Sequence, residues 1–196
     1  MDVGLSDLHQ ALQRPPKTTR LPGIRKAAVA AVLTGDLEFL LMRRAEIKGD
    51  PWSGHVSFPG GRVDPTDANP LFTAKRETME ELGLDLAKAE MLGELDPYST
   101  PMGLPALVVH PFLFYLPALP PLQPSPAEVA STHLLGLDLL LSGKGRKKFK
   151  HGYRGLKFTF PCVDFEGQRL WGLTLRVIDD LLDRLDGRGK GMARIS

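Results

Sequence analysis

Residues 60–84 read GGRVDPTDANPLFTAKRETMEELGL, and they place three carboxylates behind a tight glycine turn. Asn69 is a favourable helix N-cap, and Pro70 fits the first helical position, where a missing N–H is no loss. Gly83 is a natural stop because glycine adopts the left-handed conformation without strain. We therefore predict a helix over residues 70–82.

Three acidic side chains share one face of this helix, because Glu77, Glu80 and Glu81 are spaced i, i+3, i+4. Like charges repel, so a bound cation is expected, and carboxylate oxygens suit Mg²⁺ or Mn²⁺. The alternative is a solvated acidic face. The opposite face is expected to pack on a sheet through its apolar side chains, with Lys75 among them: Leu71, Phe72, Met79 and Leu82.

The second half of the stretch, RETMEELGL at residues 76–84, resembles the Nudix box, whose pattern is G-x5-E-x7-R-E-U-x-E-E-x-G-U with U a bulky apolar residue. Counting from Gly61, the first acidic position is Asp67 instead of Glu, and eight residues instead of seven precede Arg76. A loop tolerates such an insertion at little cost. The resemblance implies an α/β fold, the Nudix-type α/β/α sandwich with a mixed central sheet. It also implies an enzyme that hydrolyses a pyrophosphate linkage.

The same resemblance implies roles for the residues of the box. A divalent metal, Mg²⁺ or Mn²⁺, would be held mainly by Glu77 and Glu81, with Glu80 serving a second ion and the Gly61 carbonyl completing a site. Gly60 would let the backbone approach closely, and Arg76 would orient the carboxylates.

Three carboxylates are eligible as the general base: Glu80, Glu77 and Glu128. A helical residue is favoured, because a rigid backbone positions a proton acceptor better than a loop does. Glu128 follows Ser125-Pro126, which predicts the start of another helix, so it is alternatively a first-turn Glu that complements the helix dipole.

Residues 40–61 narrow the resemblance to the coenzyme A pyrophosphatase branch, whose pattern is L-L-T-x-R-[SA]-x3-R-x3-G-x3-F-P-G-G. Met42 replaces the Thr, the second Arg is absent with Lys48 nearby, and one residue too many precedes Gly54. WGLT at residues 171–174 also resembles this branch. The implied substrate is coenzyme A or acyl-coenzyme A, cleaved to adenosine 3′,5′-bisphosphate and (acyl-)4′-phosphopantetheine.

Two other functions stay open. One is hydrolysis of another nucleoside diphosphate derivative, such as ADP-ribose, a dinucleotide or capped RNA. The other is a nucleotide-sensing module without turnover, because a fold does not fix a function.

Four residues are expected to contact the substrate: Arg44, His55, Lys147 and Arg154. Arg44 leaves a predicted strand towards the glycine turn, and His55 lies close to that turn in sequence. Lys147 belongs to the basic stretch 144–150, expected as a loop that docks the 3′-phosphate or is simply solvated. Trp171 either stacks on an adenine or anchors a helix.

The remaining elements are predicted from local patterns. Residues 27–33 and 38–42 are expected to form a hairpin, and residues 91–96 and 107–116 further strands. His110 is expected to be a paired core histidine. Further expectations are a short helix at 6–13, a loop over the site at 98–105, an extended spacer at 117–126, an edge strand around Pro161 and a last helix ending at 185.

The chain has 196 residues, 42% of them hydrophobic, and a formal charge of +2, which suits one domain. We expect an N-terminal extension at 1–26 with a short helix, a catalytic domain at 27–185 and a basic tail at 186–196. Cys162 has no partner for an internal disulfide, so the cytoplasm is favoured, with organelle targeting as the alternative. The expected partner is a small nucleotide; neither nucleic acid nor membrane is expected, and a homodimer stays open.

Overall fold

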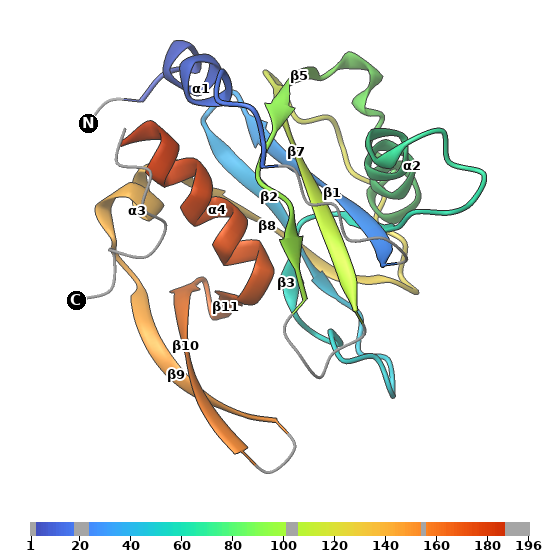
Figure 1. The fold of residues 1–196 in the computed structure, drawn as a ribbon, viewed down its shortest axis with the longest axis vertical. Coiled ribbons are helices and arrows are strands. Elements are labelled where there is room, and N and C mark those ends of the chain that lie inside the picture. Colours follow the sequence, from blue (N-terminus) through green and yellow to red (C-terminus); the bar gives the residue numbers. More distant parts are fainter. Residues whose placement is uncertain (1–2, 18–23, 101–105, 154–155, 187–196) are drawn as a thin grey trace.

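A computed structural model describes residues 3–17, 24–100, 106–153 and 156–186 (Figure 1). The helices are α1 Leu5–Leu12, α2 Pro70–Leu82, α3 Leu137–Ser142 and α4 Gly172–Leu185, with a 3-10 turn η1 at Leu86–Lys88. The strands are β1 Arg25–Thr34, β2 Glu38–Arg44, β3 Val56–Ser57, β4 Gly60–Arg62, β5 Glu90–Glu94, β6 Tyr98–Ser99, β7 Leu107–Leu116, β8 Val129–Gly136, β9 Arg146–Tyr153, β10 Leu156–Phe165 and β11 Gln168–Trp171.

The main sheet has the order β3-β2-β1-β7-β5, with β4 also on β1, β6 on β7 and β8 on β2. β1 and β7 run parallel, whereas β1 and β2 form the predicted antiparallel hairpin, so the sheet is mixed as expected. Helix α2 covers one face, and α1 and α4 cover the other (Figure 1). The α/β/α sandwich is thereby confirmed.

Both faces of β1 are buried, which explains its near-continuous apolar run. Ala30 and Val32 pack in the cluster under α2, while Ala31 and Leu33 pack in the cluster with α1 and α4. Successive side chains of a strand point to opposite faces, so one strand serves both cores.

The face of α2 that packs on the sheet differs from the prediction at two of four apolar positions. Phe72 and Met79 are 49% and 54% exposed, whereas Ala74, Thr78 and Glu81 are buried. The helix lies against β1 and β4, and β4 begins with two glycines that have no side chains to hold it away. Leu82 is buried and Leu71 packs against the same cluster, as predicted, whereas small side chains and a carboxylate take the places expected for Phe72 and Met79.

The strands β11, β10 and β9 form a second sheet in that order. This sheet contradicts two predictions, a loop at the basic stretch and an edge strand around Pro161. The basic stretch is not a loop, because residues 146–153 form β9 and pair with β10. β10 is the middle strand, so the edge prediction for Pro161 is wrong. Pro161 is nevertheless tolerated, because β11 pairs with β10 only from Cys162 onward.

Residues 125–129 do not begin a helix. The amides of Glu128 and Val129 both donate to the carbonyl of Ser125, at 3.0 and 2.9 Å, which closes a single turn before β8 begins. Residues 129–136 instead pair with β2 as an antiparallel strand along its whole length. The hydrogen bonds of this pairing outweigh the local capping signal.

The proline-rich segment before this turn is more than a spacer. The amides of Gln123 and Ser125 each donate a 2.8 Å hydrogen bond, to the carbonyls of Leu82 and Glu81 respectively. They satisfy carbonyls that the end of α2 would otherwise leave unpaired. The expected loop residues 101–105, Arg154 and the tail after 186 lie outside the described residues.

Candidate active site

Helix α2 has the predicted bounds and caps. The Asn69 side chain accepts a 2.9 Å hydrogen bond from the amide of Phe72, and Pro70 opens the helix. Gly83 is left-handed at φ 64°, and its amide donates to the carbonyl of Met79. These caps fix where the helix begins and ends.

The innermost carboxylate belongs to Glu81, which is 3% exposed. Its Oε2 accepts a 2.8 Å hydrogen bond from the amide of Gly60. Burial raises the pKa of Glu81 to about 8, against the hydrogen bond from Gly60 and the charge of Arg44. The carboxylates of Glu77 and Glu128 push the pKa upward, so these three acidic groups lie within electrostatic reach of one another.

Glu77 lies directly over the second glycine of the turn. A Cβ atom on Gly61 would overlap the Glu77 carboxylate, so only glycine admits this contact. Burial raises the pKa of Glu77, Arg76 lowers it, and Glu80 and Glu128 raise it further. The Glu77 carboxylate therefore occupies the space that a side chain at position 61 would need.

Arg76 connects the loop before α2 with the acidic face of the helix. It makes a two-pronged contact with Asp67, at 3.0 Å from both Nε and Nη2, and reaches Glu77 at 2.9 Å and Glu80 at 2.8 Å. The guanidinium holds the pKa of Asp67 far below its usual range. Asp67 also accepts a 2.7 Å hydrogen bond from the Thr73 hydroxyl. Arg76 is therefore placed to orient carboxylates.

Arg44 adds a positive charge on the other side of the cluster. Its Nη1 lies 3.8 Å from Oε1 of Glu81, and its Nη2 lies 3.1 Å from Oδ2 of Asp50. The backbone amide of Arg44 donates to the carbonyl of His55 at 3.0 Å. The sequence reasoning missed Asp50, although its Asx-type bond to the amide of Trp52 is a pattern that a D-P-W turn suggests.

The sequence of the chain matches a known family. A NUDIX domain profile matches residues 24–156, more than half of the chain. The chain belongs to the Nudix hydrolase family.

Two relatives align with most of this chain. The chain is 30% identical over 187 residues to an uncharacterized Nudix hydrolase, NudL of Photorhabdus laumondii, covering 93% of this chain and 98% of that protein. It is 38% identical over 136 residues to the mitochondrial coenzyme A diphosphatase NUDT8 of Homo sapiens, covering 67% of this chain and 56% of that protein. Other curated relatives are longer, and this chain spans 39% to 56% of their length.

Solved structures share the fold. The MutT protein of Methanosarcina mazei Go1 aligns with a TM-score of 0.56 at 20% identity, covering 87% of this chain and 99% of that chain. At this identity the likeness concerns the fold alone.

The Nudix site fits a divalent cation by its donor chemistry. Glu77, Glu81 and Glu128 repel one another, and hard oxygen ligands suit such ions. No group of three acidic, His or Cys side chains within the described ranges is already gathered to hold a metal. Arg76 accounts for this, because it binds Glu77 and Glu80. A cation would have to draw Glu77 away from Arg76.

The other residues expected to bind substrate lie in different places. His55 precedes β3, and its ring lies 4.8 Å from that of Trp171. Lys147 lies on β9 and pairs with Asp164 at 3.3 Å, so it belongs to the second sheet and not to a loop. Arg154 lies outside the described residues. His110 is half-buried and paired with Glu94 at 2.9 Å, as predicted.

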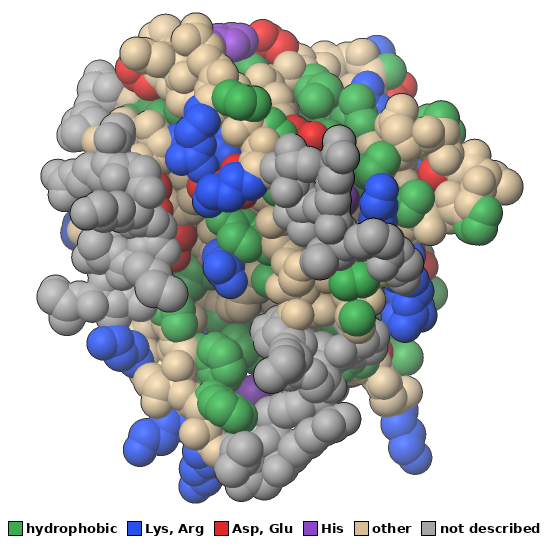
Figure 2. All heavy atoms as spheres, viewed as in Figure 1, with side chains coloured by type: hydrophobic (Ala, Val, Ile, Leu, Met, Phe, Trp, Pro, Cys, Tyr) green, Lys and Arg blue, Asp and Glu red, His purple; other side chains and the backbone are tan. Residues whose placement is uncertain are grey.

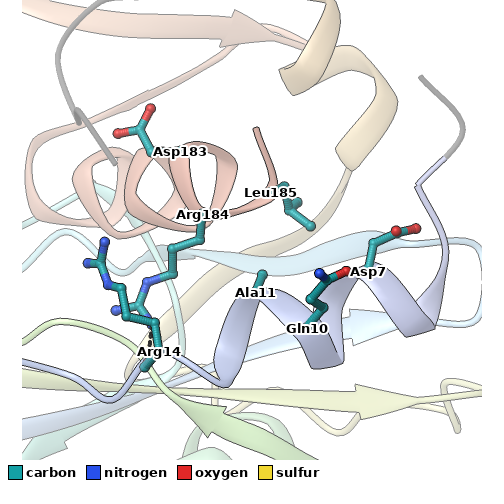
Figure 3. A pocket seen from close by; sticks show the side chains of 7 residues that line it. All are labelled: Asp7, Gln10, Ala11, Arg14, Asp183, Arg184 and Leu185. Atoms are coloured by element: carbon teal, nitrogen blue, oxygen red, sulfur yellow. Dashed lines mark hydrogen bonds between the residues drawn. The ribbon is translucent and has the colours of Figure 1, made fainter. Parts of the chain in front are cut away.

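A cavity of about 480 Å³ lies away from these carboxylates, between α1 and α4 (Figure 3). Its lining includes Arg14 and Arg184, whose guanidinium groups are paired with Asp96 and Asp180. These ion pairs connect the two helices, so we give the cavity a structural role. The candidate active site is the acidic cluster on α2.

None of the described helices has the length and apolar character that crossing a membrane requires; the longest, α4, has 14 residues.

Proposed function

We propose that the protein is a Nudix pyrophosphohydrolase that cleaves coenzyme A or acyl-coenzyme A. The products would be adenosine 3′,5′-bisphosphate and (acyl-)4′-phosphopantetheine. The observation that supports hydrolysis most strongly is the buried Glu81 carboxylate, fixed by the amide of Gly60 beside Glu77 and Glu128. The choice of substrate rests on the coenzyme A branch pattern and on the likeness to the human coenzyme A diphosphatase.

Mg²⁺ or Mn²⁺, when bound, would neutralise pyrophosphate oxygens and lower the pKa of a bound water. We assign its ligation to Glu77 and Glu81, with Glu80 contributing to a second ion and the Gly61 carbonyl completing the set. Gly60 positions Glu81 through its amide. Glu81 is thus held in place before a metal binds, whereas Glu77 would first have to leave Arg76.

The positive groups around the cluster have separate tasks in this proposal. Arg76 orients the acidic side chains from behind, because it contacts three of them and is only 27% exposed. Arg44 is the better candidate for substrate phosphate, since its side chain is 29% exposed and lies 3.8 Å from Glu81. Lys147 and Arg154 are proposed for the 3′-phosphate of coenzyme A, and His55 for the adjoining part of the substrate.

The general base is proposed among Glu80, Glu77 and Glu128. Glu80 is 55% exposed and paired with Arg76, whereas Glu128 lies close enough to raise the pKa of both Glu77 and Glu81. Any of them must reach the attacking water directly or through a second water.

The deciding experiment is a substrate panel with Mg²⁺, read by chromatography of the products. Coenzyme A is expected to give the two products above, and dephospho-coenzyme A is expected to have a kcat/KM lower by roughly ten- to a hundredfold, the usual worth of one charge-assisted hydrogen bond. Glu81→Gln is the matched inactive control. A preference for ADP-ribose, a dinucleotide or capped RNA would assign the rival substrate, and tight binding without turnover would make the protein a sensor.

The cellular setting is part of the proposal as well. We favour a cytoplasmic protein acting on a small nucleotide, alone or as a homodimer. Relatives named as mitochondrial and chloroplastic keep an organelle as the alternative.

A further inference from the structure

One face of the second sheet carries a row of aromatic side chains, which we call the stacking face: Phe149, His151, Phe158, Phe160 and Trp171. Cross-strand pairing puts Phe149 opposite Phe160 and His151 opposite Phe158. Directly paired residues point to the same side of a sheet, so these rings form one surface. All five side chains are partly or largely exposed.

Trp171 is the centre of this surface. Its ring centroid lies 4.8 to 5.4 Å from those of His55, His151, Phe149 and Phe160. The planes of these four rings are tilted from the indole plane by 48° to 83°, so none of them stacks on it in parallel. Offset-parallel stacking is an arrangement that a flat heterocycle can supply.

The stacking face lies next to the acidic cluster through a short chain of contacts. Arg44 lies 3.8 Å from Glu81, its amide donates to the carbonyl of His55 at 3.0 Å, and His55 contacts Trp171. Strand β11, which carries Trp171, also lies against β3, the strand that follows His55. A ligand whose phosphate lies at Arg44 can therefore place its neighbouring group on Trp171.

The surroundings of this surface are basic. Arg169 lies over the ring of Phe149 at 4.8 Å, and Lys147 and Arg169 share a single acidic partner, Asp164. In the view of Figure 2, hydrophobic and histidine side chains lie together beside the β9–β10 hairpin, and Lys and Arg side chains gather along its outer edge. Aromatic rings bordered by cations suit a base joined to phosphates.

We infer that the stacking face binds the nucleobase of the substrate, with Trp171 as its principal stacking partner. This inference rests on the proposed function, since it assigns one end of the substrate beside the same acidic site. The flexible arm of coenzyme A has no ring to stack, so it extends away from this surface. Adenine occurs equally in ADP-ribose and in adenosine dinucleotides, so the inference holds for the rival substrates too.

Fluorescence tests the inference without any turnover, because the chain has two tryptophans, Trp52 and Trp171. Trp52→Phe leaves Trp171 as the emitter, and Trp171→Phe leaves Trp52. We expect adenosine 3′,5′-bisphosphate to quench the first variant and to leave the second nearly unchanged, and 4′-phosphopantetheine and ribose 5-phosphate to quench neither. Quenching of the first variant by 4′-phosphopantetheine alone, or equal quenching of both variants by the adenosine product, would overturn the assignment.

Kinetics give a second, independent arm. Trp171→Leu is expected to raise KM for the substrate by about five- to a hundredfold with little change in kcat, because one stacked base contributes that much to binding. Trp171→Phe should recover most of the loss, and Phe72→Leu, an exposed ring on α2 outside the stacking face, should leave KM unchanged. A fall in kcat at constant KM for Trp171→Leu would contradict a stacking role.

The two proposals fail in different ways. Adenine-dependent quenching at Trp171 with no hydrolysis of coenzyme A would keep the stacking face and reject the substrate. Hydrolysis of coenzyme A without such quenching would keep the substrate and reject the stacking face.

Discussion

The amide of Gly60 donates a 2.8 Å hydrogen bond to Oε2 of Glu81, two residues that are 21 positions apart in the sequence. This bond ties the first residue of β4 to the innermost acid of α2. It also gives the buried carboxylate a fixed direction, which a metal ligand needs in order to be useful.

Removing the charge of Glu81 should separate activity from stability. Glu81→Gln is expected to lower kcat by at least roughly a hundredfold, because metal-bound chemistry contributes several kcal/mol. The free energy of unfolding should not fall, since Gln keeps the size of the side chain and an oxygen that can accept the hydrogen bond from the Gly60 amide. Steady-state kinetics with saturating Mg²⁺ and urea unfolding check the two parts. A kcat above a tenth of the wild-type value in Glu81→Gln or Glu77→Gln would show that the substituted residue is not a metal ligand.

The two glycines of the turn should respond differently to alanine. In Gly61→Ala the new Cβ meets the Glu77 side chain, which can move, so activity should fall while the fold persists. In Gly60→Ala it meets the backbone of β1 at a φ of 148°, so the protein should lose stability or fail to fold. Thermal unfolding and activity of both variants distinguish these outcomes; equal melting temperatures would contradict the contact geometry.

The order of two Glu→Gln variants should identify the general base. The rigid helix backbone alone would favour Glu80 as the base. Glu80 is paired with Arg76, however, whereas the charge of Glu128 raises the pKa of both Glu77 and Glu81. We expect Glu128→Gln to slow single-turnover hydrolysis at least as much as Glu80→Gln does. A smaller effect at Glu128 would return the base to the helix.

A largely buried ion-pair network should make the domain sensitive to the loss of one of its members. Arg184 is 1% exposed at its side chain and binds Asp96 at 2.8 Å and Asp180 at 3.1 Å. Arg184→Met should lower the free energy of unfolding by about 3–5 kcal/mol, because it leaves two buried acids short of a partner. The control is Arg169→Met in an exposed pair, expected to change it by less than about 1 kcal/mol. Similar urea midpoints for the two variants would refute this.

The same network predicts sensitivity to acid. Burial would raise the pKa of Asp96, but Lys17 and Arg184 outweigh it, so its pKa lies below the ordinary value. A lowered carboxyl pKa contributes stability above the ordinary value of about 3.9, and this contribution disappears as the pH falls through the folded value. Urea midpoints measured from pH 6 to pH 3 should therefore fall less steeply for Asp96→Asn than for wild type. Parallel curves would show that Asp96 does not titrate as expected.

Much of the fold could be predicted from local signals. The bounds of α2 follow from Asn69 and Gly83, and the buried strand at 107–116 follows from its apolar run. These elements are governed by caps and periodicity, which lie within a few residues of one another in the sequence.

The errors share a different cause, because each depends on a contact distant in sequence. The glycines of β4 decide which side of α2 is buried, and the edge of β2 turns residues 129–136 into a strand. Sequence patterns indicated the residues of the box and Arg44, but not what surrounds them. The pairing of Arg44 with Asp50 and the rings around Trp171 depend on how two sheets meet, which periodicity does not reveal.

The contact between Arg76 and Asp67 bears on how such chains are found. Aspartate is one methylene shorter than glutamate, and the loop before the helix is one residue longer than the usual pattern, yet the two-pronged contact forms at 3.0 Å on both arms. The longer main chain compensates for the shorter side chain. A search that demands a glutamate at fixed spacing would discard this sequence, whereas one that demands an acid within reach of the arginine would retain it.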